Sequence, residues 1–164
     1  MRVGLDDAGK IVGWDHRIAG QSIAKGGPFE AMIVHDGVDH TSVEGTVDTL
    51  YSIPGMHVGL TDGSVATTVN FWRSVGHSHN AYVMETMMDV AAAAAGQEPV
   101  SFRLAHLPGD TPDQIRKAGV LKLAAEKAGF GKDLPAGHFH GVAVHKSFGT
   151  YCAEVCEISV DGDG

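Results

Sequence analysis

The pattern of hydrophobic and polar positions predicts strands at both ends of the chain and helices between them. Residues 2–23 carry β-compatible apolar side chains on both sides of the turn-forming run Asp6–Lys10, which predicts two strands. Residues 56–60 and 66–72 also have strand-like patterns, and the Asp62–Gly63 pair between them is typical of a hairpin turn. The polar, mixed stretch 35–48 predicts a surface loop.

Three helices are predicted in the middle of the chain. The first, Ala81–Ala95, consists almost entirely of Met, Val, Tyr and Ala, so we expect it to be nearly enclosed by protein. The second begins at Pro99 and runs to Leu107. The third opens at the capping residue Thr111, runs to Ala128 and is ended by a glycine.

The last third of the chain predicts a loop followed by two strands, Gly141–His145 and Tyr151–Val160. Cys152 and Cys156 share one face of the final strand, where we expect packed thiols rather than a disulfide. Taken together, the elements predict an α+β fold in one domain, residues 1–164. In this fold a mixed β-sheet built from the N- and C-terminal strands packs against about three central helices.

The composition narrows the range of partners. The formal net charge of −8, without a basic stripe, argues against nucleic acid and against an anionic membrane surface. No apolar run approaches the ~20 residues needed to span a bilayer. The chain has no Walker sequence, no Gly-x-Gly-x-x-Gly and no nucleophile elbow, and its two cysteines leave the redox compartment open.

The stretch Arg73–Asn80 is the candidate site. Arg73 offers a guanidinium suited to phosphate, Gly76 lets the backbone come close to a ligand, and Ser78 or Asn80 can cap the helix that follows. Because helix N-termini carry unpaired N–H groups and partial positive charge, this combination favours an anion site. An ordinary loop-to-helix junction with a surface arginine is the alternative.

Ten histidines are the compositional oddity, and two pairs have His-x-His spacing: His77/His79 and His138/His140, with His145 near the second pair. On a strand such a pair shares a face and could offer two imidazoles to one metal ion. Since no Cys-x-x-Cys or His-Glu-x-x-His accompanies them, we favour loop histidines over zinc or copper ligands. Glu85 and Asp89, one helical turn apart, are expected to contact solvent or ion-pair partners rather than to catalyse.

A resemblance to a known family runs in order along the chain. Residues 71–85, Phe-Trp-Arg-Ser-Val-Gly-His-Ser-His-Asn-Ala-Tyr-Val-Met-Glu, resemble a segment of the molybdenum-binding large subunits of the xanthine dehydrogenase and aldehyde oxidase family. The isoquinoline 1-oxidoreductase β-subunit type is the most similar branch. Supporting stretches are 13–18 with 28–30, 43–45 with 51–54, and 141–149. Before the tryptophan–arginine pair, this chain departs from the family's longer, proline-containing connection.

The resemblance implies a molybdopterin cofactor, in bacterial members often a molybdenum cytosine dinucleotide, which a fragment need not retain. It also implies hydroxylation of an N-heteroaromatic or aldehyde carbon with oxygen from water. The implied partners are the remainder of the large subunit and an iron–sulfur small subunit. The resemblance leaves bacterial cytoplasm and periplasm equally open.

By matching position, Arg73, Ser74, Val75 and Gly76 would contact the cofactor. Val75 would also border the substrate pocket, at a place where some relatives have an aromatic, and Phe148 is a weaker candidate for its wall. No glutamate here matches the family's catalytic glutamate segment, so no catalytic residue and no metal ligand is assigned.

We therefore expect an internal fragment, or a truncated product, of such a subunit that is inactive alone and exposes apolar surface, so that it can form homo-oligomers. Two alternatives stay open: a non-catalytic binding or assembly module, and a histidine-based metal-binding protein.

Overall fold

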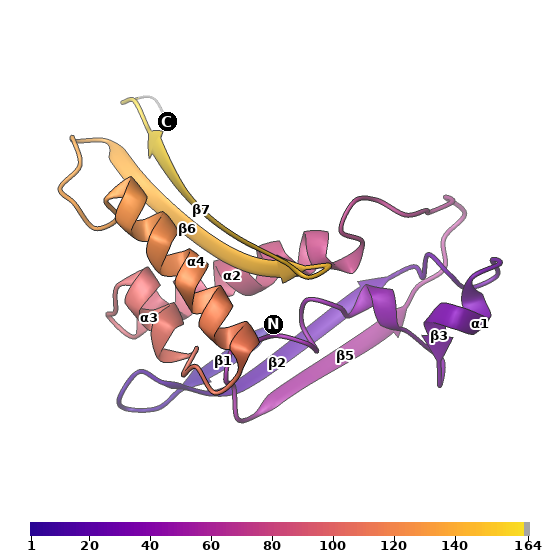
Figure 1. The fold of residues 1–164 in the computed structure, drawn as a ribbon. Helices are drawn as coiled ribbons and strands as arrows, with labels where there is room; N and C mark the ends of the chain where they lie inside the picture. Colours follow the sequence, from indigo (N-terminus) through magenta and orange to yellow (C-terminus); the bar gives the residue numbers. More distant parts are fainter. Residues whose placement is uncertain (163–164) are drawn as a thin grey trace. The chain divides into compact units, whose positions relative to one another are not determined.

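The described residues form two sets of elements, the first with a three-stranded and a two-stranded sheet and the second with one two-stranded sheet (Figure 1). The computed structural model describes residues 1–162. Residues 1–49 and 53–96 form a first unit, and Leu50–Ser52 with residues 97–162 belong to a second.

A three-stranded mixed sheet organises the first unit, with β2 (Ile11–Gly20) between β1 (Arg2–Leu5) and β5 (Met56–Asp62). The β1–β2 pair is antiparallel, as predicted, and the Asp6 carboxylate accepts backbone N–H bonds from Ala8 and Lys10 within the turn. β5 runs parallel to β2, from Trp14 opposite Met56 to Gly20 opposite Asp62. The hairpin predicted around Asp62–Gly63 is therefore wrong, and residues 66–72 form no strand.

The stretch 35–48 is more ordered than the surface loop that its polarity predicts. A short helix, α1 (Glu30–Ile33), precedes it. A small antiparallel hairpin of β3 (Val34–His35) and β4 (Val38–Asp39) lies mostly within it, and a 3₁₀ turn, η1 (His40–Ser42), follows this hairpin. Asp39 is buried because its carboxylate caps η1, accepting from the Thr41 N–H at 2.9 Å and from Ser22 Oγ at 2.5 Å. The prediction of a surface loop is wrong for this reason.

The long helix α2 (Gly76–Ala94) begins five residues before the predicted start. Met84, Met88, Ala91 and Ala92 are buried, as expected for its apolar face. The prediction that protein encloses nearly all of this helix is wrong, because the side chains of Tyr82 and Val90 on its other side are 72% and 54% exposed. Glu85 is buried, so of the two contacts predicted for it, solvent is wrong and an ion-pair partner stays a prediction.

The second unit consists of helices α3 (Pro99–Ala105) and α4 (Pro112–Ala128) and the antiparallel hairpin of β6 (His138–Ser147) and β7 (Thr150–Ser159). Both helices start as the sequence predicts: Glu98 caps α3, and Thr111 Oγ1 accepts the Gln114 N–H of α4. Gly129 ends α4 in the left-handed conformation. The core of this unit joins residues of α3, α4, β6 and β7; its fully buried members are Val100, Leu121, Val142 and Val144.

The α+β class is confirmed. Within the described residues, the N-terminal strands form the mixed sheet, and the C-terminal strands form a separate two-stranded sheet. Cys152 and Cys156 are unpaired, as expected, but both are exposed on the hairpin, so the prediction that they pack as thiols is wrong. No described helix is long and apolar enough to cross a bilayer.

Candidate functional site

The backbone just before α2 is strained. Ser74 has φ 60° and Val75 has φ 46°, both in the left-handed region. For a β-branched residue such as Val75 this conformation is rare, and each such residue costs on the order of 1–3 kcal/mol. The Val75 N–H donates to Trp72 O at 3.0 Å and Ser78 Oγ donates to Arg73 O at 2.6 Å, and these bonds hold the turn in place.

Glu44 caps α2 from a distant part of the sequence. Its Oε1 accepts the Gly76 N–H at 2.8 Å across a separation of 32 residues, and its Oε2 lies 3.8 Å from His77 Nε2. Asn80 Nδ2 donates to the carbonyls of Ser42 and Glu44 at 3.2 and 2.8 Å. The predicted caps, Ser78 and Asn80, are therefore wrong: the residue before the helix is Val75, which makes no side-chain cap.

Gly76 is required by packing inside the protein. A Cβ at this position would lie 1.9 Å from Thr41 O and 2.9 Å from Glu44 Cγ, so only glycine allows the 41–44 segment to meet the helix start. The close backbone approach that the sequence predicts exists, and the group that approaches is the protein's own carbonyl.

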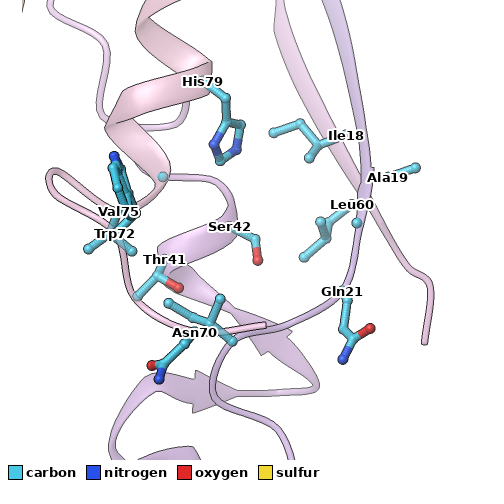
Figure 2. Close-up of a pocket in the computed structure, with 13 residues that line it drawn as sticks. Ile18, Ala19, Gln21, Thr41, Ser42, Leu60, Asn70, Trp72, Val75 and His79 are labelled. Atoms are coloured by element: carbon cyan, nitrogen blue, oxygen red, sulfur yellow. The ribbon is translucent and has the colours of Figure 1, made fainter. Parts of the chain in front are cut away.

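A cavity of about 270 Å³ lies beside this helix start (Figure 2). Ile18 and Leu60 come from β2 and β5, Thr41 and Ser42 from η1, and Trp72 from the loop before α2. The remaining lining residues are Ala19, Gly20, Gln21, Ile23, Asn70, Val75, Gly76 and His79. Figure 2 shows the His79 imidazole projecting from the helix toward the strands, whereas Trp72 and Val75 form the opposite side.

The cavity is neutral and mostly apolar. Among the described residues that line it, none is Lys, Arg, Asp or Glu, and His79 is the titratable one. Burial lowers the pKa of His16, and the charge of the N-terminus and, to a smaller extent, that of His79 lower it further. His16 is buried and its Nδ1 has no hydrogen-bond partner in the structure, so its surroundings disfavour the charged imidazolium.

The structure brings together some of the sequence-predicted site residues. Val75 and Gly76 line the cavity. Ser74 is half-buried and is not among the lining residues. Arg73 is exposed and is not among the lining residues. Phe148 belongs to the second unit, where it is 75% exposed in the β6–β7 turn with φ 47°.

The two His-x-His pairs differ in geometry. His77 and His79 lie on a helix rather than a strand, so His77 turns toward Glu44 while His79 turns into the cavity. His138 and His140 lie on β6, not in the expected loop, and both contact Glu157, Nδ1 to Oε1 at 3.0 Å and Nε2 to Oε2 at 3.3 Å. These hydrogen bonds lower the pKa of Glu157. Within residues 1–162 no three His, Cys, Asp or Glu side chains are arranged to hold a metal ion.

For most of the cavity's residues, no local pattern in the sequence predicts that they share a pocket. Ile18, Leu60 and Trp72 are distant in the sequence and meet only through the parallel β2–β5 pairing and the strained turn. Glu44, which positions the helix start, is likewise a lone glutamate in a polar stretch.

The cofactor that the resemblance implies fits this cavity only in part. Asn70, Gln21, Ser42 and His79 offer hydrogen-bonding groups at the edges of an apolar slot, which suits a flat, neutral ring. Phosphates do not fit, because the lining has no cation and the first helix N–H is already bonded to the Glu44 carboxylate.

Comparisons with known proteins agree at the level of the fold. No family model matches the sequence, and no curated protein matches it. Among solved structures, the aldehyde oxidoreductase from Desulfovibrio gigas is similar, with a TM-score of 0.50 and 20% sequence identity over 87% of this chain. The chain spans 16% of that protein's length. The likeness shows that this α+β arrangement also occurs as part of a much larger oxidoreductase.

Proposed function

We propose that this chain is a segment of the large subunit of a molybdenum hydroxylase and that its first unit forms one wall of a pocket for a flat, neutral ring. Two independent observations support the family. The sequence resemblance runs in order along the chain, and the similar solved structure is an aldehyde oxidoreductase matched over 87% of this chain.

The cavity beside α2 carries the proposal of ring binding. Its volume of about 270 Å³ accommodates one or two fused aromatic rings, and its lining is apolar with polar groups at the edges. In this proposal Trp72 stacks on the ring, Val75 and Leu60 contact its faces, and His79 and Asn70 bond to its heteroatoms. An N-heteroaromatic substrate and the pterin itself share this chemistry.

Two residues outside the cavity have different proposed roles. Arg73, being exposed, would meet a phosphate from the solvent side of the turn rather than through the cavity. Phe148 stays a candidate for a pocket wall on the second unit. Because no carboxylate lines the cavity, we expect no hydroxylation by this chain alone.

Ligand titration tests the ring pocket. Both tryptophans lie in the first unit, Trp72 81% exposed at the cavity and Trp14 2% exposed, so quenching of Trp72 fluorescence reports occupancy. We expect saturable quenching by isoquinoline or by a simple pterin with a dissociation constant on the order of 1 mM, given ligands of this size. A Trp72→Phe variant, which keeps Trp14, should lose the signal.

A matched pair of variants tests the position of the pocket. Leu60→Phe narrows the cavity and should abolish binding, whereas Leu123→Phe, at a 54% exposed position of α4, should leave it unchanged. Unsaturable quenching, or equal quenching in both variants, would refute ring binding. Molybdenum found by elemental analysis of the purified protein, together with pterin fluorescence, would support the family. Zinc or copper without molybdenum and pterin would favour the metal-binding alternative.

A further inference from the structure

A second cavity, the polar cavity, adjoins the ring cavity beside α2. It has a volume of about 300 Å³, and its lining residues are Gln21, Ser22, Lys25, Gly26, Asp62 and Ser64. Gln21 lines both cavities, and Figure 2 shows it at the end of the ring cavity away from His79. All of these residues belong to the first unit. The neutral ring cavity is therefore bordered by a cavity that contains an ammonium and a carboxylate.

The ends of two parallel strands place the polar cavity within reach of a bound ring. β2 and β5 end side by side, with Gly20 opposite Asp62. Leu60 lines the ring cavity, and Asp62, two residues later, lines the polar cavity. Alternate residues of a strand share a face, and two residues span roughly 7 Å, so the Asp62 carboxylate lies on the side of β5 that faces the ring cavity. This separation suits a short substituent on the ring.

Hydrogen bonds hold the walls of the polar cavity in place. Ser22 is buried, and its hydroxyl donates to Asp39 at 2.5 Å and accepts the Lys25 N–H at 3.0 Å. On the other side, Gln21 Oε1 accepts the Val65 N–H at 3.1 Å. Because these bonds use backbone groups and the side chains of Ser22, Asp39 and Gln21, the shape of the cavity does not depend on the side chain of Lys25.

The polar cavity carries more negative than positive charge. Lys25 Nζ lies 2.5 Å from Asp62 Oδ2, and this hydrogen bond is the largest cause that lowers the pKa of Asp62. The charge of Asp39 opposes that lowering, so its field reaches the cavity. Glu30 adds a third carboxylate, which accepts the Gly26 N–H at 2.8 Å. Among the described side chains that line this cavity or bond to its lining residues, one ammonium stands against three carboxylates, and the cavity therefore favours a cation.

We propose that the two cavities form one binding site for an aromatic ring that carries a short cationic substituent, with the ring in the ring cavity and the cation at Asp62. This inference rests on the proposed ring pocket and names the ring compounds that the pocket prefers. The Ser22 N–H also bonds the Asp62 carboxylate and fixes it, whereas the long Lys25 side chain can turn toward solvent when a ligand ammonium arrives. A carboxylate or phosphate substituent would add to the excess of negative charge and is disfavoured.

Titrations of the full chain with matched ligands test this preference. Quenching of Trp72 fluorescence reports binding of isoquinoline, of its aminomethyl and hydroxymethyl derivatives and of its carboxylate, each substituted at the same ring carbon. The aminomethyl derivative is charged at neutral pH, and we expect it to bind at least about fivefold more tightly than the hydroxymethyl derivative, as for a partly exposed ion pair. High salt should reduce this ratio by screening. The carboxylate should bind more weakly than isoquinoline itself.

Two variants with opposite expected effects test the position of the cation. Asp62→Asn removes the carboxylate and should remove most of the ratio between the aminomethyl and hydroxymethyl derivatives. Lys25→Gln removes the competing ammonium and should raise that ratio by about threefold. Loss of folding cannot produce both effects. Asp15→Asn is the matched control, because it removes the same charge from the opposite face of the sheet to Ile18, and it should leave the ratio unchanged.

The outcomes separate the cation site from the ring pocket. If isoquinoline quenches Trp72 saturably but the aminomethyl and hydroxymethyl derivatives bind equally, the ring pocket stands and the cation site is refuted. The same holds if Asp62→Asn and Asp15→Asn show the same ratio. If none of the ligands gives saturable quenching, both the ring pocket and the cation site are refuted.

Discussion

Replacing Gly76 by alanine perturbs the junction on which the cavity depends. The added Cβ would lie 1.9 Å from Thr41 O, whereas Cβ contacts in proteins do not fall below 3.0 Å, so the two backbones must separate by more than 1 Å. That movement breaks the 2.8 Å bond from Gly76 N to Glu44 and strains the two bonds that Asn80 donates. The substitution therefore removes a cap and overpacks a buried contact together.

The expected cost follows from these losses. A hydrogen bond to a carboxylate contributes about 1.5–3 kcal/mol, and overpacking costs about 1–3 kcal/mol. Alanine's better helix propensity returns at most about 1 kcal/mol. We therefore expect the free energy of unfolding of the first unit to fall by about 1.5–5 kcal/mol, a large part of a typical domain's stability.

Urea unfolding followed by tryptophan fluorescence measures this change, because both tryptophans lie in the first unit and Trp14 is buried. With a slope of about 2 kcal/mol per molar urea, the midpoint should fall by roughly 0.8–2.5 M. Gly63→Ala is the matched control, since a Cβ there meets nothing within 4 Å and should shift stability by less than about 0.5 kcal/mol. If Gly76→Ala unfolds within 1 kcal/mol of the parent, on the order of the measurement error, the assigned helix junction is wrong.

Three further variants test other parts of the structure. Burial lowers the pKa of His16 in the folded protein, so as the pH falls this imidazole is protonated in the unfolded chain before it is protonated in the folded one. The first unit should therefore lose stability below pH 6.5, by up to about 1.4 kcal/mol per pH unit. His16→Gln should flatten this dependence in unfolding followed by fluorescence. In the second unit, Leu121→Ala should cost about 2–5 kcal/mol by circular dichroism because the side chain is fully buried, whereas Leu123→Ala, 54% exposed, should cost little. Val75→Gly should stabilise the first unit by about 1 kcal/mol through relief of the φ 46° strain, while weakening isoquinoline binding in the Trp72 titration.

The sequence predicts best the elements whose signals are local. Thr111, the proline after it and Gly129 mark both ends of α4 within the helix itself, and the structure agrees with them. The Asp6 turn likewise lies between the two strands that it joins. In each case the residues that determine the boundary are neighbours in the chain, so propensity and capping rules suffice.

The sequence predicts poorly the elements that depend on distant partners. The start of α2 depends on Glu44, 32 residues upstream, and so the local capping candidates Ser78 and Asn80 misplace it. The Asp62–Gly63 signal favours a hairpin, but the parallel pairing of β5 with β2 outweighs it. The sequence does not predict the cavity for both of these reasons, because its walls are the parallel strands β2 and β5 and the start of α2, which the local signals predict five residues too late.

Glu44 also changes what the helix start can bind. A helix presents one set of unpaired N–H groups, and here the first of them already bonds a carboxylate that the fold holds beside it. An external anion at this place would have to displace Glu44 and leave its charge without a hydrogen-bond donor, which costs more than the helix dipole returns. The anion site suggested by a glycine, an arginine and a helix start is thus filled from within. The strained Val75, the exposed Trp72 and the neutral lining of the cavity are what remain for a ligand, and they favour a ring over a phosphate.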